Sequence, residues 1–316
     1  MKNSYDVVVI GGGAAGLNGA LMLARARRSV LVIDGEQPRN APAMGVHGLL
    51  GHDGVAPGEL LARGRQEVRS YGGEIMTGQV VAALRDGELF TVSLADGQSV
   101  SARRLLVATG LVDELPDVPG LKEQWGKDVV HCPYCHGWEV RDAAIGVLAT
   151  GPLSVHQALL FRQWSDDIAF FAGTGPQPSP EQREQLDARG IRIVEGDVAA
   201  VEVVDDRIVG IRLRDGELVR REVIAVSTRM VARAGFLAQL GLEAEPHPSG
   251  AGEYVSAEPG GRSAVPGVWV AGNVHDLRAQ VGAAAAGGAL AAAELNADLV
   301  LEETASAVAE ARARAA

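Results

Sequence analysis

The chain has 316 residues, enough for two domains, because a single hydrophobic core usually stops growing at about 250–300 residues. Its formal net charge of −11 argues against a nucleic-acid partner and an anionic membrane, since both select basic surfaces. No signal-peptide pattern follows Met1 and no apolar run is long enough to span a bilayer, so we expect a cytoplasmic protein without a membrane partner.

The N-terminal segment predicts a strand–turn–helix–strand unit. The strands cover Tyr5–Ile10 and Val30–Ile33, and the helix covers Leu17–Arg28. The turn fits G-x-G-x-x-G, which brings a pyrophosphate to the helix N-terminus, and Asp34 stands where an acid binds a ribose hydroxyl. A glycine-rich turn without a ligand is the alternative, but the complete unit favours a dinucleotide site. Its residues are Gly11, Gly13, Ala14, Ala15, Gly16 and Asp34.

The next segment predicts mainly β structure. Gln37–Gly58 is irregular and rich in Pro and Gly, and a helix covers Glu59–Tyr71. Alternating patterns predict strands within Glu74–Leu94 and Ser99–Ala108. The last strand runs into two further candidate site residues, Thr109 and Gly110.

The two cysteines of the chain, Cys132 and Cys135, form a Cys-x-x-Cys motif. A secreted disulfide scaffold would carry more cysteines, so the motif indicates a catalytic dithiol. A helix starting there would lower the pKa of one thiol, and His136 is placed to act as the acid–base group. The alternative is half of a zinc site completed by His131 and His136, but we predict no metal.

A second unit of the same kind is predicted after the cysteines, with its strand, helix and strand over Ala144–Leu148, Val155–Trp164 and Ile168–Phe171. Its turn keeps only Gly151 of the glycine motif, and Pro152 removes an N–H donor. The turn after the third element carries no basic residue to bind a 2′-phosphate. Two losses in one site predict that NADPH is not an efficient reductant.

The C-terminal segment predicts a strand over Val268–Ala271, a small-residue turn and an Ala-rich helix that begins near Val281. From Glu302 onward the sequence predicts a polar helix or a frayed tail. The candidate site residues here are Gly272, Asn273, Gln280 and Val281.

The order of these motifs resembles low-molecular-weight thioredoxin reductase along nearly the whole chain. The resemblance implies FAD, a homodimer and a redox-active disulfide in a smaller inserted domain. It implies FAD contacts from the N-terminal motif, Arg39, Thr109, Gly110 and the four C-terminal residues named above. Asn273 departs from the family, which usually carries Asp there, but an amide can still bind a ribityl hydroxyl. His136 also replaces the usual Asp, and in this the chain is similar to the gliotoxin- and holomycin-type dithiol oxidases.

The predicted fold is therefore α/β, with two Rossmann-like, three-layer ββα dinucleotide-binding domains, the second inserted into the first. The expected boundaries are 1–113 for the first part of the FAD domain, 114–245 for the insert and 246–316 for the second part.

Three functions remain open from the sequence. The favoured one is a dithiol oxidase, in which a small dithiol reduces the Cys132–Cys135 disulfide, Cys135 passes the electrons to FAD, and oxygen is the final acceptor. The second is a thioredoxin reductase that reduces a protein disulfide with NADPH or ferredoxin. The third is a flavin-binding sensor without turnover, against which the intact Cys-x-x-Cys-His argues.

Overall fold

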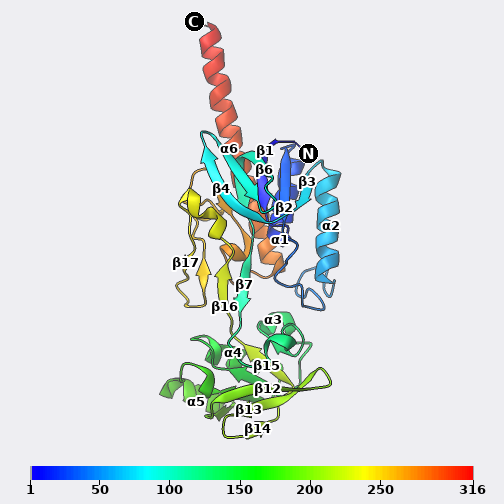
Figure 1. Cartoon of the computed structure of the whole chain (residues 1–316), viewed down its shortest axis with the longest axis vertical. Coiled ribbons are helices and arrows are strands. Elements are labelled where there is room, and N and C mark those ends of the chain that lie inside the picture. The colour runs from blue at the N-terminus through cyan, green and yellow to red at the C-terminus, as the bar shows by residue number, and fades with distance from the viewer. Residues whose placement is uncertain (1, 316) are drawn as a thin grey trace.

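The computed structural model describes residues 2–315 and contains two α/β halves, one above the other (Figure 1). The upper half is built on a parallel sheet in the order β3-β2-β1-β6-β19. These strands cover Glu74–Thr77, Val30–Asp34, Ser4–Ile10, Ser99–Val107 and Val268–Val270. An antiparallel meander extends from the first part of β6 through β5 (Leu89–Leu94) and β4 (Val80–Asp86).

Helices and meander cover opposite faces of the upper sheet. Three helices cover one face: α1 (Ala14–Arg25), α2 (Pro57–Ser70) and α6 (Val281–Ala315). Their side chains Leu17, Leu23 and Leu295 pack against strand residues that point to this face. On the other face Phe90 and Val92 of the meander close a second core layer. The carboxyl ends of the parallel strands point toward the lower half (Figure 1), and this is the edge at which such sheets bind ligands.

The lower half repeats this plan. Its parallel sheet has the order β11-β10-β9-β15-β8, over Arg192–Val194, Ile168–Phe171, Ile145–Leu148, Val223–Val226 and Val129–Val130. Helices α4 and α5, over Ser154–Phe161 and Pro180–Ala188, cover one face. A three-stranded antiparallel sheet covers the other face; its strands are β12 (Val198–Val204), β13 (Arg207–Leu213) and β14 (Leu218–Val219). The prediction of two three-layer Rossmann-like units is confirmed.

Two antiparallel strands join the halves, β7 (Leu111–Glu114) and β16 (Arg229–Ala232). Everything between them belongs to the lower half, so the second unit is inserted into the first. After β16, Ala234, Leu237 and Leu242 pack in the core of the upper half. We therefore propose that the return crossing lies at β16 rather than near residue 245. The hairpin β17–β18, over Glu245–Pro246 and Glu253–Tyr254, follows this return.

Helices α1 and α5 differ most from the sequence-based expectation. Helix α1 begins at Ala14 instead of Leu17, because Gly13 is the extended N-cap and the helix starts within the glycine motif. It ends at Arg25, and Arg27 then adopts a positive φ of 65°. Helix α5 was not predicted, although Ser179 and Gln182 form a capping box that marks its start.

Helix α6 runs without a break to Ala315, so the segment after Glu302 is helical in the structure. Its last part projects from the body (Figure 1), and Arg103 and Arg104 hold Glu302 and Asp298 near the point where it leaves. Within residues 2–315, α6 alone has the length and apolar composition of a membrane span. Core helices of soluble proteins meet the same criterion, and α6 buries Ala284, Gly288, Ala291, Ala292, Leu295 and Leu299. The expectation of no membrane partner stays a prediction.

The contact between α1 and α6 gives a first test of the packing. A Cβ atom at Gly288 would lie 1.9 Å from the Ala15 carbonyl oxygen, whereas one at Gly287 would meet nothing within 4 Å. We expect Gly288→Ala to lower the free energy of unfolding by about 1–3 kcal/mol, because α6 must move away from α1. Gly287→Ala is the matched control and should raise it by about 0.5–1 kcal/mol through helix propensity. Equal denaturant midpoints for the two variants would contradict the crossing.

Candidate functional site

Helix α3 (Pro133–His136), which carries the cysteine pair, lies in the lower half on the side that faces the upper half (Figure 1). Cys132 is the extended N-cap of α3, and it forms a disulfide with Cys135 across a Cα–Cα distance of 5.2 Å. Because α3 has only one turn, its dipole is smaller than that of a long helix. Trp164 positions this turn: Tyr134 packs edge-on against its ring, and a Cβ at Gly137 would lie 2.7 Å from it.

A cavity of about 2180 Å³ connects the disulfide with the ends of the upper strands. It brings together every predicted site residue except Gly16. These residues are Gly11, Gly13, Ala14, Ala15, Asp34, Arg39, Thr109, Gly110, Cys132, Cys135, His136, Gly272, Asn273, Gln280 and Val281. Gly16 lies beneath the turn, where a Cβ would be 1.9 Å from the Gly11 carbonyl oxygen. Segments more than 100 residues apart in the sequence thus form one site.

The glycine turn fits the pyrophosphate of FAD. Gly11 has a φ of 107°, and a Cβ there would lie 2.4 Å from the Ala108 carbonyl oxygen, so only glycine keeps the turn this close to β6. A Cβ at Gly13 would meet nothing within 4 Å, and no side chain caps the α1 N-terminus. The first amides of α1 are therefore available to an anion.

Asp34 stands at the end of β2 beside this turn. Its Oδ1 accepts the Glu36 amide at 3.0 Å, and its Oδ2 lies 3.4 Å from the Arg65 guanidinium. A Cβ at Gly12 would be 2.3 Å from Oδ2, so the carboxylate packs directly against the glycine backbone. This position suits a ribose hydroxyl, and the sequence alone gave no reason to include Arg65.

The structure explains why asparagine replaces aspartate in the C-terminal turn. The Asn273 Nδ2 group donates to the carbonyl oxygens of Asp276 and Ala279, both at 2.9 Å. An aspartate carboxylate has no proton to donate and would face these oxygens with like charge. The amide therefore holds the turn, and its Oδ1 is the atom left for a ribityl hydroxyl.

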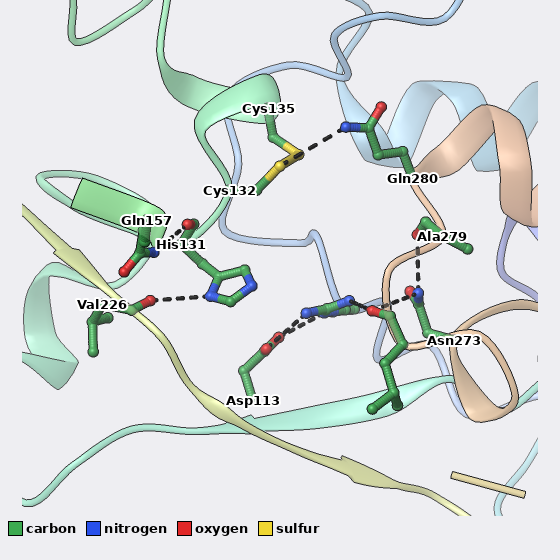
Figure 2. Close-up of a disulfide and its surroundings, with 11 residues drawn as sticks. Asp113, His131, Cys132, Cys135, Gln157, Val226, Asn273, Ala279 and Gln280 are labelled. Carbon is green, nitrogen blue, oxygen red and sulfur yellow. Dashed lines mark hydrogen bonds and ion pairs between the residues drawn. A yellow bond between two sulfur atoms is a disulfide. The ribbon is translucent and has the colours of Figure 1, made fainter. Parts of the chain in front are cut away.

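The N-terminus of α6 reaches the redox pair. Gln280 precedes α6, accepts the Ala284 amide at 2.8 Å, and places its Nε2 3.9 Å from the Cys132 Sγ (Figure 2). This contact joins the proposed flavin end of the upper half to the disulfide of the lower half. It involves Cys132, whereas the sequence-based assignment puts Cys135 beside the flavin, so that assignment stays a prediction. Thr109 acts structurally as well, donating to the Arg233 carbonyl oxygen at 2.7 Å.

His136 lies at the C-terminal end of α3. Both of its ring nitrogens are buried, and neither has a hydrogen-bond partner among the described residues. Burial lowers the pKa of His136 below its ordinary value, although the Glu139 carboxylate acts in the opposite direction. The neutral ring therefore predominates at neutral pH and can accept a proton.

Arg39 makes a contact that the sequence did not indicate. Its guanidinium binds both carboxylate oxygens of Asp113 on β7, at 2.7 and 2.8 Å, and Thr228 donates to the same carboxylate at 2.6 Å. Burial alone would raise the pKa of Asp113, but the hydrogen bonds and charge of Arg39 hold it below its ordinary value. Arg39 thus secures the crossing between the halves and also lines the cavity.

The zinc alternative is not supported in the part of the chain from residue 2 to residue 315. No group of three or more His, Cys, Asp or Glu side chains there is arranged to hold a metal ion. His131, which that alternative would recruit, instead binds the Val226 carbonyl oxygen at 3.0 Å through Nδ1 (Figure 2).

The degenerate turn of the second half is closed by its own side chains. The buried Ser154 hydroxyl accepts the Thr150 and Gly151 amides at 3.0 and 3.1 Å, and the Thr150 hydroxyl donates to the Ser227 carbonyl oxygen at 2.6 Å. Beyond β10, Gln177 donates to the Ala172 carbonyl oxygen at 2.8 Å. Arg183, which binds Gln177 at 3.0 Å, is paired with Glu195 at 2.5 Å.

Comparisons with known proteins agree with this geometry. The family model described as pyridine nucleotide-disulphide oxidoreductase matches residues 5–301. Thioredoxin reductase tcpT of Claviceps purpurea (strain 20.1) is 35% identical over 289 residues, which cover 86% of this chain and 87% of that protein. Among solved structures, HlmI is 47% identical with a TM-score of 0.94, covering 100% of this chain and 99% of that one. An oxidoreductase from Agrobacterium tumefaciens is 33% identical with a TM-score of 0.88, covering 94% and 99%.

These matches span both halves and the cysteine pair, and they confirm the resemblance to thioredoxin reductases. A fold with two Rossmann-like units, a cradle that fits FAD and a disulfide facing it are what the family's chemistry requires. The chain belongs to the pyridine nucleotide-disulphide oxidoreductase family and is a flavin-dependent disulfide oxidoreductase.

Proposed function

We propose that this protein is a dithiol oxidase, which closes a disulfide in a small dithiol and passes the two electrons through Cys132, Cys135 and FAD to oxygen. The observation that carries the proposal is the closed turn of the second half. Ser154 takes the two amides that would otherwise be available to a phosphate. NADPH would have to break both hydrogen bonds, each worth about 0.5–1.5 kcal/mol.

A second observation supports the same conclusion. The turn after β10 (Ala172–Thr174) carries no charge, and Arg183 is already paired with Glu195. A 2′-phosphate would therefore lack the charge-assisted hydrogen bonds that distinguish NADPH, which are worth about 1.5–3 kcal/mol each. With the nucleotide route weakened, a dithiol is the reductant that the remaining site can accept.

The cysteine pair and its neighbour carry the chemistry. A substrate thiolate attacks the Cys132 sulfur, and Cys135 leaves as a thiolate. The second substrate thiol then attacks the mixed disulfide, which releases the substrate as a disulfide and Cys132 as a thiol. FAD held in the cradle would supply the two-electron acceptor that returns the pair to its disulfide form, and oxygen would take up the two electrons with two protons to give hydrogen peroxide. His136 moves protons near Cys135.

The runner-up is a thioredoxin reductase driven by NADPH or ferredoxin. The observation that favours it is the 35% identity to the relative from Claviceps purpurea, which is named a thioredoxin reductase. We also propose, from the resemblance and the composition, that the protein is a cytoplasmic homodimer.

The deciding experiment follows the visible absorbance of the protein's flavin without oxygen. We expect no rapid bleaching by NADPH, rapid bleaching by dithiothreitol, and recovery of the absorbance with hydrogen peroxide formation when air is admitted. Ser154→Gly tests whether the closed turn excludes NADPH, because it frees the Thr150 and Gly151 amides without adding bulk.

Three other outcomes of this experiment would contradict the proposal. Rapid bleaching of the wild-type protein by NADPH would replace the proposal with a thioredoxin reductase. Bleaching by reduced ferredoxin but by neither other donor would do the same. Failure of every donor would leave the flavin-binding sensor.

A further inference from the structure

A buried polar cluster lies beneath the disulfide, where β7 and β16 join the halves. Three consecutive residues, Val226, Ser227 and Thr228, each bind a different partner near the cavity. The first partner is His131, the residue immediately before Cys132. The sequence gave His131 no role beyond the rejected zinc site, and the function proposed above does not use it.

The hydrogen bond to Val226 fixes the tautomer of His131. A carbonyl oxygen can only accept, so Nδ1 at 3.0 Å must carry the proton. In the neutral ring Nε2 then has a free lone pair. Figure 2 shows Nε2 on the side of the ring away from Val226, and His131 lines the same cavity as Cys132 and Cys135. No hydrogen bond from another described residue engages this nitrogen.

The backbone of His131 is held as firmly as its ring. Gln157 donates to the His131 carbonyl oxygen at 2.6 Å, and Ser227 donates to the Gln157 amide oxygen at 3.1 Å. The ring is therefore fixed relative to the Cys132 backbone by two elements of the lower half, α4 and the end of β15. Such fixed geometry is required of an acid–base group but is unnecessary for a residue that only fills space.

The groups around His131 have opposite effects on its pKa. Burial lowers the pKa of His131, the Asp113 carboxylate raises it, and the Arg39 guanidinium lowers it. His136 also interacts with His131 electrostatically. The ring is thus neutral at neutral pH, and the imidazolium that forms after proton transfer is stabilised by Asp113.

We propose that His131 is the base that accepts the proton of the substrate thiol attacking Cys132. In this step the thiol S–H bond breaks and Nε2 takes the proton. The thiolate forms a bond to the Cys132 sulfur, and the electron pair of the Cys132–Cys135 bond leaves on Cys135. His136 moves protons at the Cys135 sulfur, so the two histidines act on different sulfur atoms. This inference rests on the proposed function, because it assumes a dithiol substrate.

The test is anaerobic flavin bleaching at several pH values, with two dithiols of different acidity. For His131→Asn we expect the rate with dithiothreitol to fall about 100-fold or more, in the range of one general base. The rate with an aromatic dithiol, which is already ionised at neutral pH, should fall less than 5-fold. The wild-type rate with dithiothreitol should be level above the pKa of His131, whereas the rate of the variant should keep rising with pH in proportion to the thiolate fraction of dithiothreitol.

Asp113→Asn provides a second test that keeps the imidazole. Because Asp113 raises the pKa of His131, its neutral replacement should move the acidic decline of the rate to lower pH. General damage to the site would lower the rate at every pH without moving the decline.

Equal losses with both dithiols in His131→Asn, or an unmoved decline in Asp113→Asn, would overturn the role of His131 and leave the proposed function intact. If neither dithiol bleaches the wild-type protein, the proposed function fails, and this inference fails with it.

Discussion

Replacing Cys135 with serine is expected to reduce dithiol-driven bleaching of the flavin to the background rate, while the protein stays yellow. A serine hydroxyl cannot form the disulfide with Cys132 that accepts the substrate's electrons. Neither cysteine belongs to the residues that cradle FAD at the α1 N-terminus, so flavin content should be unchanged. Anaerobic bleaching by dithiothreitol measures the loss, and full activity in Cys135→Ser would refute the scheme.

Cys132→Ser is the matched variant and should be equally inactive, but the two should differ toward disulfide reagents. In Cys135→Ser the remaining thiol is the proposed outer sulfur, which should form a stable mixed disulfide because no second thiol resolves it. In Cys132→Ser the remaining thiol should react more slowly. Mass spectrometry of the two adducts decides the assignment, and the contact between Gln280 and Cys132 makes the comparison worthwhile. Faster labelling of Cys132→Ser would reverse the roles of the sulfurs.

The second large effect is expected from Arg39→Met, which should lower the free energy of unfolding by about 3–5 kcal/mol at pH 7. The Asp113 side chain is 6% exposed and would keep only the Thr228 hydroxyl as a partner, so an unpaired charge would remain buried. Chemical denaturation, followed through the flavin and the tryptophans, measures the loss.

The stability lost in Arg39→Met should depend on pH. The folded-state pKa of Asp113 is lowered, so the pair contributes stability above the unfolded pKa, about 3.9, and loses it as pH falls through the folded value. In Arg39→Met, burial raises the pKa of the carboxyl, which is then neutralised at a higher pH than in the wild type. The difference between the two proteins should therefore shrink as pH falls from 7 toward 4.

A neighbouring ion pair supplies the control. Arg229 on β16 pairs with Glu114 and Glu253, but both Arg229 and Glu114 are 53% exposed. Arg229→Met should cost only about 0–1 kcal/mol. The double variant Arg39→Met/Asp113→Asn should recover part of the loss, since it removes the unpaired charge. Equal effects of Arg39→Met and Arg229→Met would show that the crossing does not depend on the buried pair.

The two dinucleotide-binding units and the cysteine pair could be predicted from the amino-acid sequence because their signals are local. A glycine turn between an apolar strand and a helix, and two cysteines three residues apart, need only short-range geometry to be interpreted. These signals predicted the two dinucleotide-binding units and the cradle of the first, whereas the insertion of one unit into the other was implied by the resemblance to thioredoxin reductase. Local signals also predicted the damage to the second nucleotide turn, where Pro152 and the missing basic residues are visible in the chain itself.

The folded structure was needed to show which side chains form hydrogen bonds with one another. Asp113 and Arg39 are 74 residues apart, and His131 and Val226 are 95 apart, so no periodicity or motif could pair them. Asn273 is a different case, because its partners are only three and six residues away, but the sequence did not show that its amide donates to the carbonyl oxygens of its own turn. Hydrogen bonds depend on distance and orientation in space, and neither can be derived from the positions of these residues along the chain.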